Sequence, residues 1–218
     1  MNILAIDTCT EIASVSLNKN GESFSRVLSG VDKTSGHVLK LCDEVFKESQ
    51  TQLQEVELIS YSRGPGSFTG VRMCIGVVQG LSLSMQIPTM GFTTLELVGL
   101  RASKLLESKK IAIALDARMG EVYWATYIEG LIDNVKICPP EEVDILDHSF
   151  IGVGSGWKAY GEKLKSASNI TDINLSVSPE SSALIELSLQ AINRGLKGTL
   201  DLPQPIYLRN NVAQKSLK

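Results

Sequence analysis

Short apolar runs that alternate with amphipathic stretches are the main pattern of this chain. Segments 3–7 and 112–116 are apolar runs that end in an aspartate, and each is followed by a polar turn and then by alternating apolar and polar residues. An apolar run beside an alternating one predicts a buried central strand paired with a half-exposed neighbour. Because this unit occurs in both halves of the chain, the sequence predicts two related subdomains.

Helical periodicity marks most of the intervening segments. Apolar side chains recur at helical spacing over residues 37–49, 68–85, 94–106 and 182–193, with Gly195 as the expected C-cap of the last helix. Further strands are predicted at 56–62 and 150–153. We therefore expect an α/β fold of two subdomains with mixed sheets flanked by helices. The N-terminal subdomain would span residues 1–106, and a smaller, reduced second subdomain would span 107–218.

The run Ser62-Arg63-Gly64-Pro65-Gly66-Ser67-Phe68-Thr69-Gly70-Val71-Arg72 joins a predicted strand to the helix at 68–85. Gly66 can take a positive φ, and Ser67 or Thr69 can cap the helix. A strand, a glycine turn and a helix N-terminus can form an anion-binding loop. They can equally form a connection that needs glycine only for steric reasons. Pro65 has no N–H to offer a phosphate and no lysine follows, so the turn alone favours the steric interpretation. The later glycine run at 152–156 is likewise interpreted as a strand-to-helix turn.

Composition excludes several classes of protein. The chain has 218 residues, 43% of them hydrophobic, and a net charge of −3, so nothing attracts nucleic acid globally. Its four cysteines are widely spaced without a CxxC pair, which argues against a zinc knuckle or a disulfide framework. We find no basic, apolar signal-peptide pattern and no run of roughly 20 apolar residues that would span a bilayer. The sequence predicts a cytoplasmic protein with reduced thiols.

Few residues suggest catalysis. Asp7 and Asp116 each end a predicted strand, where two carboxylates could hold Mg²⁺ across a cleft or could cap the following turns. Arg118 is expected to pair with Glu121 across such a turn. The chain contains only two histidines, His37 and His148, and no pattern suggests a nucleophile with an oriented base. The sequence therefore predicts no catalytic, cofactor-binding or metal-binding residues.

Four separated segments resemble the TsaB (YeaZ) family and occur in that family's order. They are 3–8 (ILAIDT), 63–72 (RGPGSFTGVR), 116–123 (DARMGEVY) and 205–209 (PIYLR). The resemblance implies the actin-like, sugar-kinase-type ATPase fold, built from two ribonuclease-H-like subdomains. It also implies a non-catalytic role in forming N6-threonylcarbamoyladenosine on tRNA, beside the related catalytic subunit TsaD and the small ATPase TsaE.

The resemblance also shows what is missing. TsaD-type relatives hold a metal through a helical His-x-x-x-His pair, whereas the corresponding segment here, 91–97, contains no histidine. Active members of the superfamily follow the first-strand aspartate with glycine, whereas Asp7 is followed by Thr8-Cys9-Thr10-Glu11. We therefore expect a scaffold that reaches tRNA only through the complex. The alternative is a divergent stand-alone ATPase or kinase of the same fold.

The helix at 68–85 is the predicted partner surface. Val71, Cys74, Ile75, Val78, Leu81 and Ser82 form the stripe expected to face the sheet. Gly76, Gly80 and Ser84 form a second stripe, and Met73 and Val77 lie beside it. Helical glycine costs about 0.8–1 kcal/mol relative to alanine, so this stripe suggests close approach of another backbone. That backbone belongs either to the helix at 37–49 or to a partner. Leu39 and Phe46, off the buried stripe of that helix, favour a partner: the catalytic paralogue, or a second copy of this chain.

Overall fold

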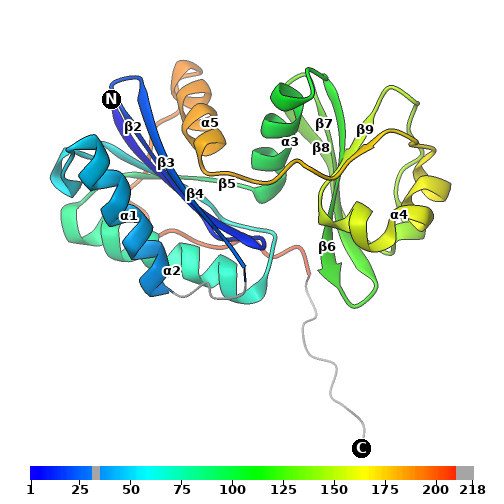
Figure 1. Ribbon diagram of the computed structural model, residues 1–218, viewed down its shortest axis with the longest axis horizontal. Coiled ribbons are helices and arrows are strands. Elements are labelled where there is room, and N and C mark those ends of the chain that lie inside the picture. The colour runs from blue at the N-terminus through cyan, green and yellow to red at the C-terminus, as the bar shows by residue number, and fades with distance from the viewer. Residues whose placement is uncertain (31–34, 210–218) are drawn as a thin grey trace, which may run out of the picture.

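The computed structural model describes residues 1–30 and 35–209. Within them, two five-stranded sheets stand side by side (Figure 1). The first sheet contains β1 (Asn2–Asp7), β2 (Ile12–Lys19), β3 (Glu22–Ser29), β4 (Leu58–Ser62) and β5 (Thr89–Phe92). The second contains β6 (Lys110–Arg118), β7 (Glu121–Ile128), β8 (Leu131–Cys138), β9 (Ile151–Val153) and β10 (Ile173–Asn174). The helices are α1 (Ser35–Ser49), α2 (Phe68–Met85), α3 (Thr94–Leu105), α4 (Ser155–Ser168) and α5 (Ser182–Asn193).

The two sheets have the same topology. Their strand orders are β3-β2-β1-β4-β5 and β8-β7-β6-β9-β10. In each sheet three consecutive antiparallel strands are followed by two parallel ones. The predicted α/β fold, with a repeated unit and mixed sheets flanked by helices, is confirmed.

Helices cover both faces of each sheet, which gives the molecule five layers (Figure 1). Helices α1 and α2 pack on the outer face of the first sheet, and α5 packs on its inner face. Helix α3 packs on the inner face of the second sheet, and α4 on the outer face. Since α3 and α5 also contact each other, they form a shared central layer between the sheets.

The helices of this central layer cross the boundary at residue 106 that the sequence predicted between the two subdomains. Helix α3 comes from the range 1–106 but packs on the second sheet, whereas α5 comes from 107–218 and packs on the first. Leu95 and Val98 of α3 and Leu184 of α5 belong to one buried apolar cluster with residues of both sheets. Each half of the chain thus covers an apolar face of the other, and the two ranges are not separate packing units.

The sequence predicted that the strand paired with β1 is half-exposed, and for β2 this prediction is wrong. Its residues from Ala13 to Asn18 are buried, because α1 covers one face of the strand and α5 the other. The half-exposed position belongs to the edge strand β3, where exposed and partly buried residues alternate. Strands β3, β5, β8 and β10 were not predicted, since edge strands and short strands carry a weak apolar pattern.

One helix among the described residues has the length and composition of a membrane span. Helix α2 has 18 residues and a mean hydropathy of 1.2. This is weak evidence, because core helices of soluble proteins pass the same test. One face of α2 packs on β1 and β4, and Cys74 and Val78 are fully buried there. The apolar character of α2 is explained in part by this packing.

Candidate partner surface and interdomain cleft

The glycine turn between β4 and α2 packs tightly against the segment that follows β1. Ser67 caps α2, and its hydroxyl accepts a hydrogen bond from the Gly70 N–H at 3.1 Å. A Cβ on Gly66 would lie 2.1 Å from the Cys9 carbonyl oxygen, and one on Gly70 would lie 2.1 Å from the Thr8 carbonyl oxygen. These two glycines therefore serve close packing, in agreement with the steric interpretation. The positive φ in this turn belongs to Gly64 (+94°) and not to Gly66, the residue for which the sequence allowed it.

The second glycine run has the same construction. It connects β9 to α4, and Gly154 has a φ of +105°. A Cβ on Gly154 would lie 2.5 Å from the Ala114 carbonyl oxygen, and one on Gly156 would lie 2.9 Å from the same residue. The interpretation as a strand-to-helix turn is confirmed. In the first half the glycine turn packs against the segment that follows β1, and in the second half it packs against β6 itself.

Each of the two strand-end aspartates stabilises the turn that follows its strand. Asp7 Oδ1 accepts a hydrogen bond from the Cys9 N–H at 3.1 Å, and Asp116 Oδ1 accepts one from the Arg118 N–H at 2.8 Å. Asp7 is fully buried, whereas Asp116 lines the cavity between the two units. The two carboxylates do not line a common cavity, so the geometry supports turn capping over a shared Mg²⁺ site.

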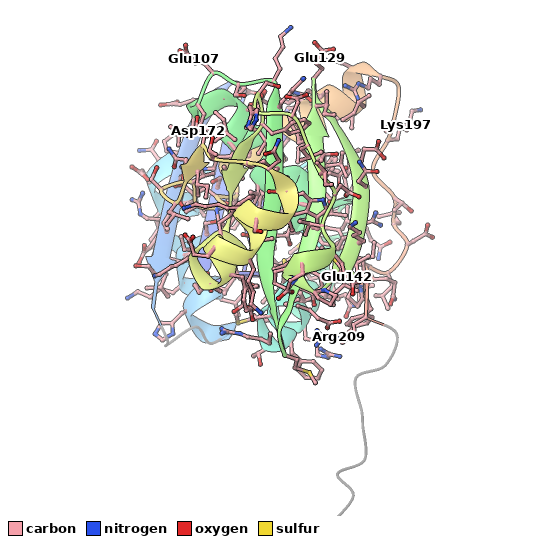
Figure 2. All side chains as sticks on the ribbon, turned by 90° about the vertical axis from the view of Figure 1, so that its right-hand side faces the viewer. Glu107, Glu129, Glu142, Asp172, Lys197 and Arg209 are labelled. Atoms are coloured by element: carbon pink, nitrogen blue, oxygen red, sulfur yellow. The ribbon has the colours of Figure 1, made fainter. Side chains whose placement is uncertain are left out.

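The predicted pair between Arg118 and Glu121 is wrong. Arg118 pairs with Asp116, with 3.0 Å between guanidinium and carboxylate. The Arg118 N–H donates to the same carboxylate at 2.8 Å, so backbone and side chain of Arg118 both lie at the strand end. Glu121 pairs instead with Arg209 from the far end of the chain. The Arg209 guanidinium also donates to the Ala117 carbonyl at 3.2 Å. Figure 2 shows Arg209 at the lower end of the molecule. The segment before Arg209 is tied to the first unit, where the Ile206 N–H donates to the Arg63 carbonyl at 2.8 Å.

A cavity of about 650 Å³ lies between the two units. Its walls come from the turn after β1, the start of α2, the end of β6, the start of α4 and the C-terminal segment. The lining residues are Cys9, Thr10, Glu11, Gly30, Pro65, Gly66, Ser67, Phe68, Val71, Arg72, Leu115, Asp116, Ala117, Arg118, Tyr123, Ser155, Ile206, Tyr207, Leu208 and Arg209. We call this cavity the interdomain cleft. Sequence patterns did not single out Phe68, Arg72 or Tyr207, because only the fold brings them together.

The predicted glycine stripe of α2 faces outward. Gly76, Gly80 and Ser84 are exposed, and a Cβ on either glycine would meet no atom within 4 Å. Helix α1 therefore does not fill the space in front of these glycines, which was one of the two predicted possibilities. The neighbouring Leu83 is 59% exposed, and sequence reasoning missed it.

The other predicted interface residues divide into three groups. On α1, which lies on the same face of the first sheet as α2 (Figure 1), Leu39 is 47% exposed. Phe46 and Met73 are partly buried and pack against the core below both helices. Val77 is buried, so its predicted place on the outer surface is wrong. The helix turns Val77 toward the sheet beside Val78. The exposed residues Leu39, Gly76, Gly80, Leu83 and Ser84 are called the α1/α2 face below.

No group of three or more histidine, cysteine, aspartate or glutamate side chains able to hold a metal ion occurs in residues 1–30 and 35–209. His37 is exposed in the first turns of α1, and His148 lies before β9, where it contacts Asn169 at 3.4 Å. The two histidines therefore belong to opposite units. All four cysteines are buried free thiols, and burial raises the pKa of Cys42 to about 12.

Comparison with known proteins identifies the family. The family model of TsaD, tRNA N6-adenosine threonylcarbamoyltransferase, matches residues 32–217. The tRNA threonylcarbamoyladenosine biosynthesis protein TsaB of Escherichia coli is 33% identical over 100% of this chain and 98% of its own length. The TsaB protein of Haemophilus influenzae is 30% identical over 100% of this chain and 97% of its own. The chain belongs to the TsaB (YeaZ) family.

Solved structures agree with this assignment. YeaZ from Pseudomonas aeruginosa is 32% identical, with a TM-score of 0.85 over 95% of this chain and 99% of that chain. A second Pseudomonas aeruginosa structure, described as similar to peptidase YEAZ, gives 33% identity and a TM-score of 0.88 over the same shares. The predicted TsaB family and its actin-like, ribonuclease-H-like fold are confirmed. The repeated sheets described above are the two halves of that fold.

Proposed function

We propose that this chain is a non-catalytic subunit in the formation of N6-threonylcarbamoyladenosine on tRNA. In this proposal it docks through the α1/α2 face onto a TsaD-related catalytic subunit and acts together with a TsaE-like ATPase. The chain works in the cytoplasm and meets tRNA only within the complex. When the catalytic subunit is absent, a second copy of the chain covers the same face. The biosynthetic role named for its TsaB relatives is the starting point.

The observation that carries the docking proposal is the open space in front of Gly76 and Gly80. Glycine within a helix lowers stability by about 0.8–1 kcal/mol relative to alanine, and nothing within the described residues offsets that cost at these two positions. A helix surface without side chains lets a second helix approach more closely than the usual 8–10 Å. Leu39 and Leu83 add exposed apolar area beside this opening, as expected for the centre of an interface.

The packing of the glycine turn supports the non-catalytic part of the proposal. In an active phosphate site, backbone N–H groups next to glycine approach the anion. Here the Thr8 and Cys9 carbonyl oxygens lie against Gly70 and Gly66, so these glycines face protein backbone rather than a ligand. Asp116, which could orient a metal, is occupied by the Arg118 N–H and side chain.

The test replaces Gly80 by leucine. We expect Gly80→Leu to abolish complex formation with the TsaD protein of the organism that encodes this chain, because the added side chain enters the interface. At concentrations where both chains are monomeric, the variant should melt at a slightly higher temperature than the unchanged chain, since leucine is the better helix former and meets no neighbour. Size-exclusion chromatography of the mixture and thermal melting of the variant alone give the two readings.

Gly161→Leu is the matched control. Gly161 is also a helical glycine with no atom within 4 Å of a Cβ, but it lies on α4 in the other unit. Gly161→Leu should bind the TsaD protein like the unchanged chain. If Gly80→Leu binds normally, or if Gly161→Leu loses binding as well, the α1/α2 face is not the docking surface.

The interdomain cleft is the one observation that favours a stand-alone ATPase or kinase. Titration calorimetry of the isolated chain with ATP and Mg²⁺ distinguishes the two functions. The scaffold proposal expects no heat of binding and no turnover. Submillimolar binding accompanied by ATP hydrolysis would support the enzyme.

A further inference from the structure

The interdomain cleft combines apolar walls with five charged side chains, of which Arg72 and Glu11 have opposite signs and form no ion pair within residues 1–30 and 35–209. Val71, Leu115 and Leu208 contribute apolar surface, and Tyr123 and Tyr207 contribute aromatic rings. Its volume of about 650 Å³ falls within the range of small-molecule sites, which is roughly 300–1,000 Å³. A pocket of this kind binds the apolar body of a ligand, and its few polar groups fix the orientation.

Arg72 is the first of these polar groups. Its guanidinium carbon lies 3.4 Å from the centroid of the Phe68 ring and 5.3 Å from that of the Tyr207 ring. One nitrogen donates to the Phe68 carbonyl at 3.1 Å, which leaves further N–H donors available. Arg72 forms no ion pair with any carboxylate of the described residues. The two rings therefore hold a cation whose natural counter-ion would be a carboxylate or another anion.

Glu11 is the second polar group. It is exposed in the turn after β1 and lines the same cleft. Within residues 1–30 and 35–209 it forms no ion pair. Apart from Arg72, the other charged lining residues are paired: Asp116 with Arg118, and Arg209 with Glu121. Glu11 thus offers an anion for which an ammonium group is the natural partner.

We infer that the interdomain cleft binds a small zwitterion of amino-acid or dipeptide type with an aromatic or other apolar side chain. The ligand carboxylate lies at Arg72, the ammonium group lies at Glu11, and the apolar side chain lies between the walls of the cleft. The unpaired carboxylate of Glu11 favours a ligand that carries a cation as well as an anion over a purely anionic one. This inference is separate from the docking proposal, which concerns residues further along α2, from Gly76 to Ser84.

Three related probes separate the contributions of the two charges. L-tryptophan carries both charges, indole-3-propionate lacks the ammonium group, and tryptamine lacks the carboxylate. Each is titrated at pH 7 into the ¹⁵N-labelled chain, and the amide signals of Thr10, Ser155 and Leu208 report on the cleft. We expect saturable shifts, with L-tryptophan binding about tenfold more tightly than either of the other two.

Charge-removing variants then assign the orientation. Arg72→Gln should weaken L-tryptophan and indole-3-propionate about tenfold and leave tryptamine unchanged. Glu11→Gln should weaken L-tryptophan and tryptamine and leave indole-3-propionate unchanged. The control is Arg194→Gln, which changes an exposed arginine at the end of α5 and should leave the binding of all three probes unchanged.

Each cleft variant should still bind one of the three probes normally, and this binding shows that the variant is folded. The inference is overturned if no probe gives saturable shifts up to about 10 mM, if all three bind alike, or if both variants bind every probe normally.

Discussion

Two pairs of glycines in segment 66–80, one at each end, have different surroundings. Gly66 and Gly70, at the start of α2, lie against the backbone of the segment after β1, so any side chain there would collide with a carbonyl oxygen. Gly76 and Gly80, about two and three turns after Gly70 in the same helix, face open space. The first pair is required by the fold. The second pair lowers helix stability without a packing gain inside the chain, which is the pattern expected where another molecule completes the surface.

The largest effect is expected at the close-packed pair, Gly66 and Gly70. Gly66→Ala places a Cβ 2.1 Å from the Cys9 carbonyl oxygen, so backbone must shift, and the free energy of unfolding should fall by about 2–3 kcal/mol. Gly76→Ala is the matched control at the exposed pair and should raise it by about 0.8–1 kcal/mol. Urea unfolding followed by circular dichroism measures both. Equal changes in the free energy of unfolding would show that the surroundings of Gly66 and Gly76 do not differ. The docking proposal would then fail.

A smaller effect is expected where the C-terminal segment joins the two units. Arg209 and Glu121 have side chains that are 20% and 33% exposed, and the guanidinium also donates to the Ala117 carbonyl. Arg209→Ala should therefore lower the free energy of unfolding by about 1–2 kcal/mol. Arg118→Ala removes a pair whose arginine is 78% exposed and should cost at most about 1 kcal/mol. Urea unfolding measures both variants. Equal losses in the free energy of unfolding would show that the contacts of Arg209 do not stabilise the second unit.

The smallest effect concerns the inner side of α1, opposite exposed Leu39. Burial raises the pKa of Cys42 from 9.0 to about 12, so above pH 9 the unfolded chain loses a proton that the folded chain retains. Folding stability from this group is complete below pH 9 and declines as the pH rises. Between pH 8 and pH 9.5 it should fall by about 0.8 kcal/mol. In Cys42→Ala this part of the pH dependence should be missing from urea midpoints. An unchanged slope would show that Cys42 is accessible and that α1 is rotated on the sheet.

The sequence predicted the parts of the fold that depend on local pattern. The bounds of α2 and α5 and the repeat ending in Asp7 and Asp116 are visible as periodicity, and the outward direction of Gly76 and Gly80 follows from helical spacing. Contacts between distant segments were not predictable in this way. The pairing of Glu121 with Arg209 and the packing of α3 on the second sheet depend on tertiary arrangement. Val77 was misplaced because it lies at the border between the buried and the exposed side of α2, where spacing alone does not decide.

Amide hydrogen exchange of the chain, with and without the TsaD protein, tests the central claim most directly. At concentrations where the free chain is monomeric, the docking proposal predicts that binding slows exchange in α1 and α2 and leaves α4, on the far side of the second sheet, unchanged. The exposed sides of both helices are compared in a single experiment, without altering the sequence. Protection confined to α4 or β8, or a stable complex with no protection in α1 and α2, would contradict the assignment of the α1/α2 face.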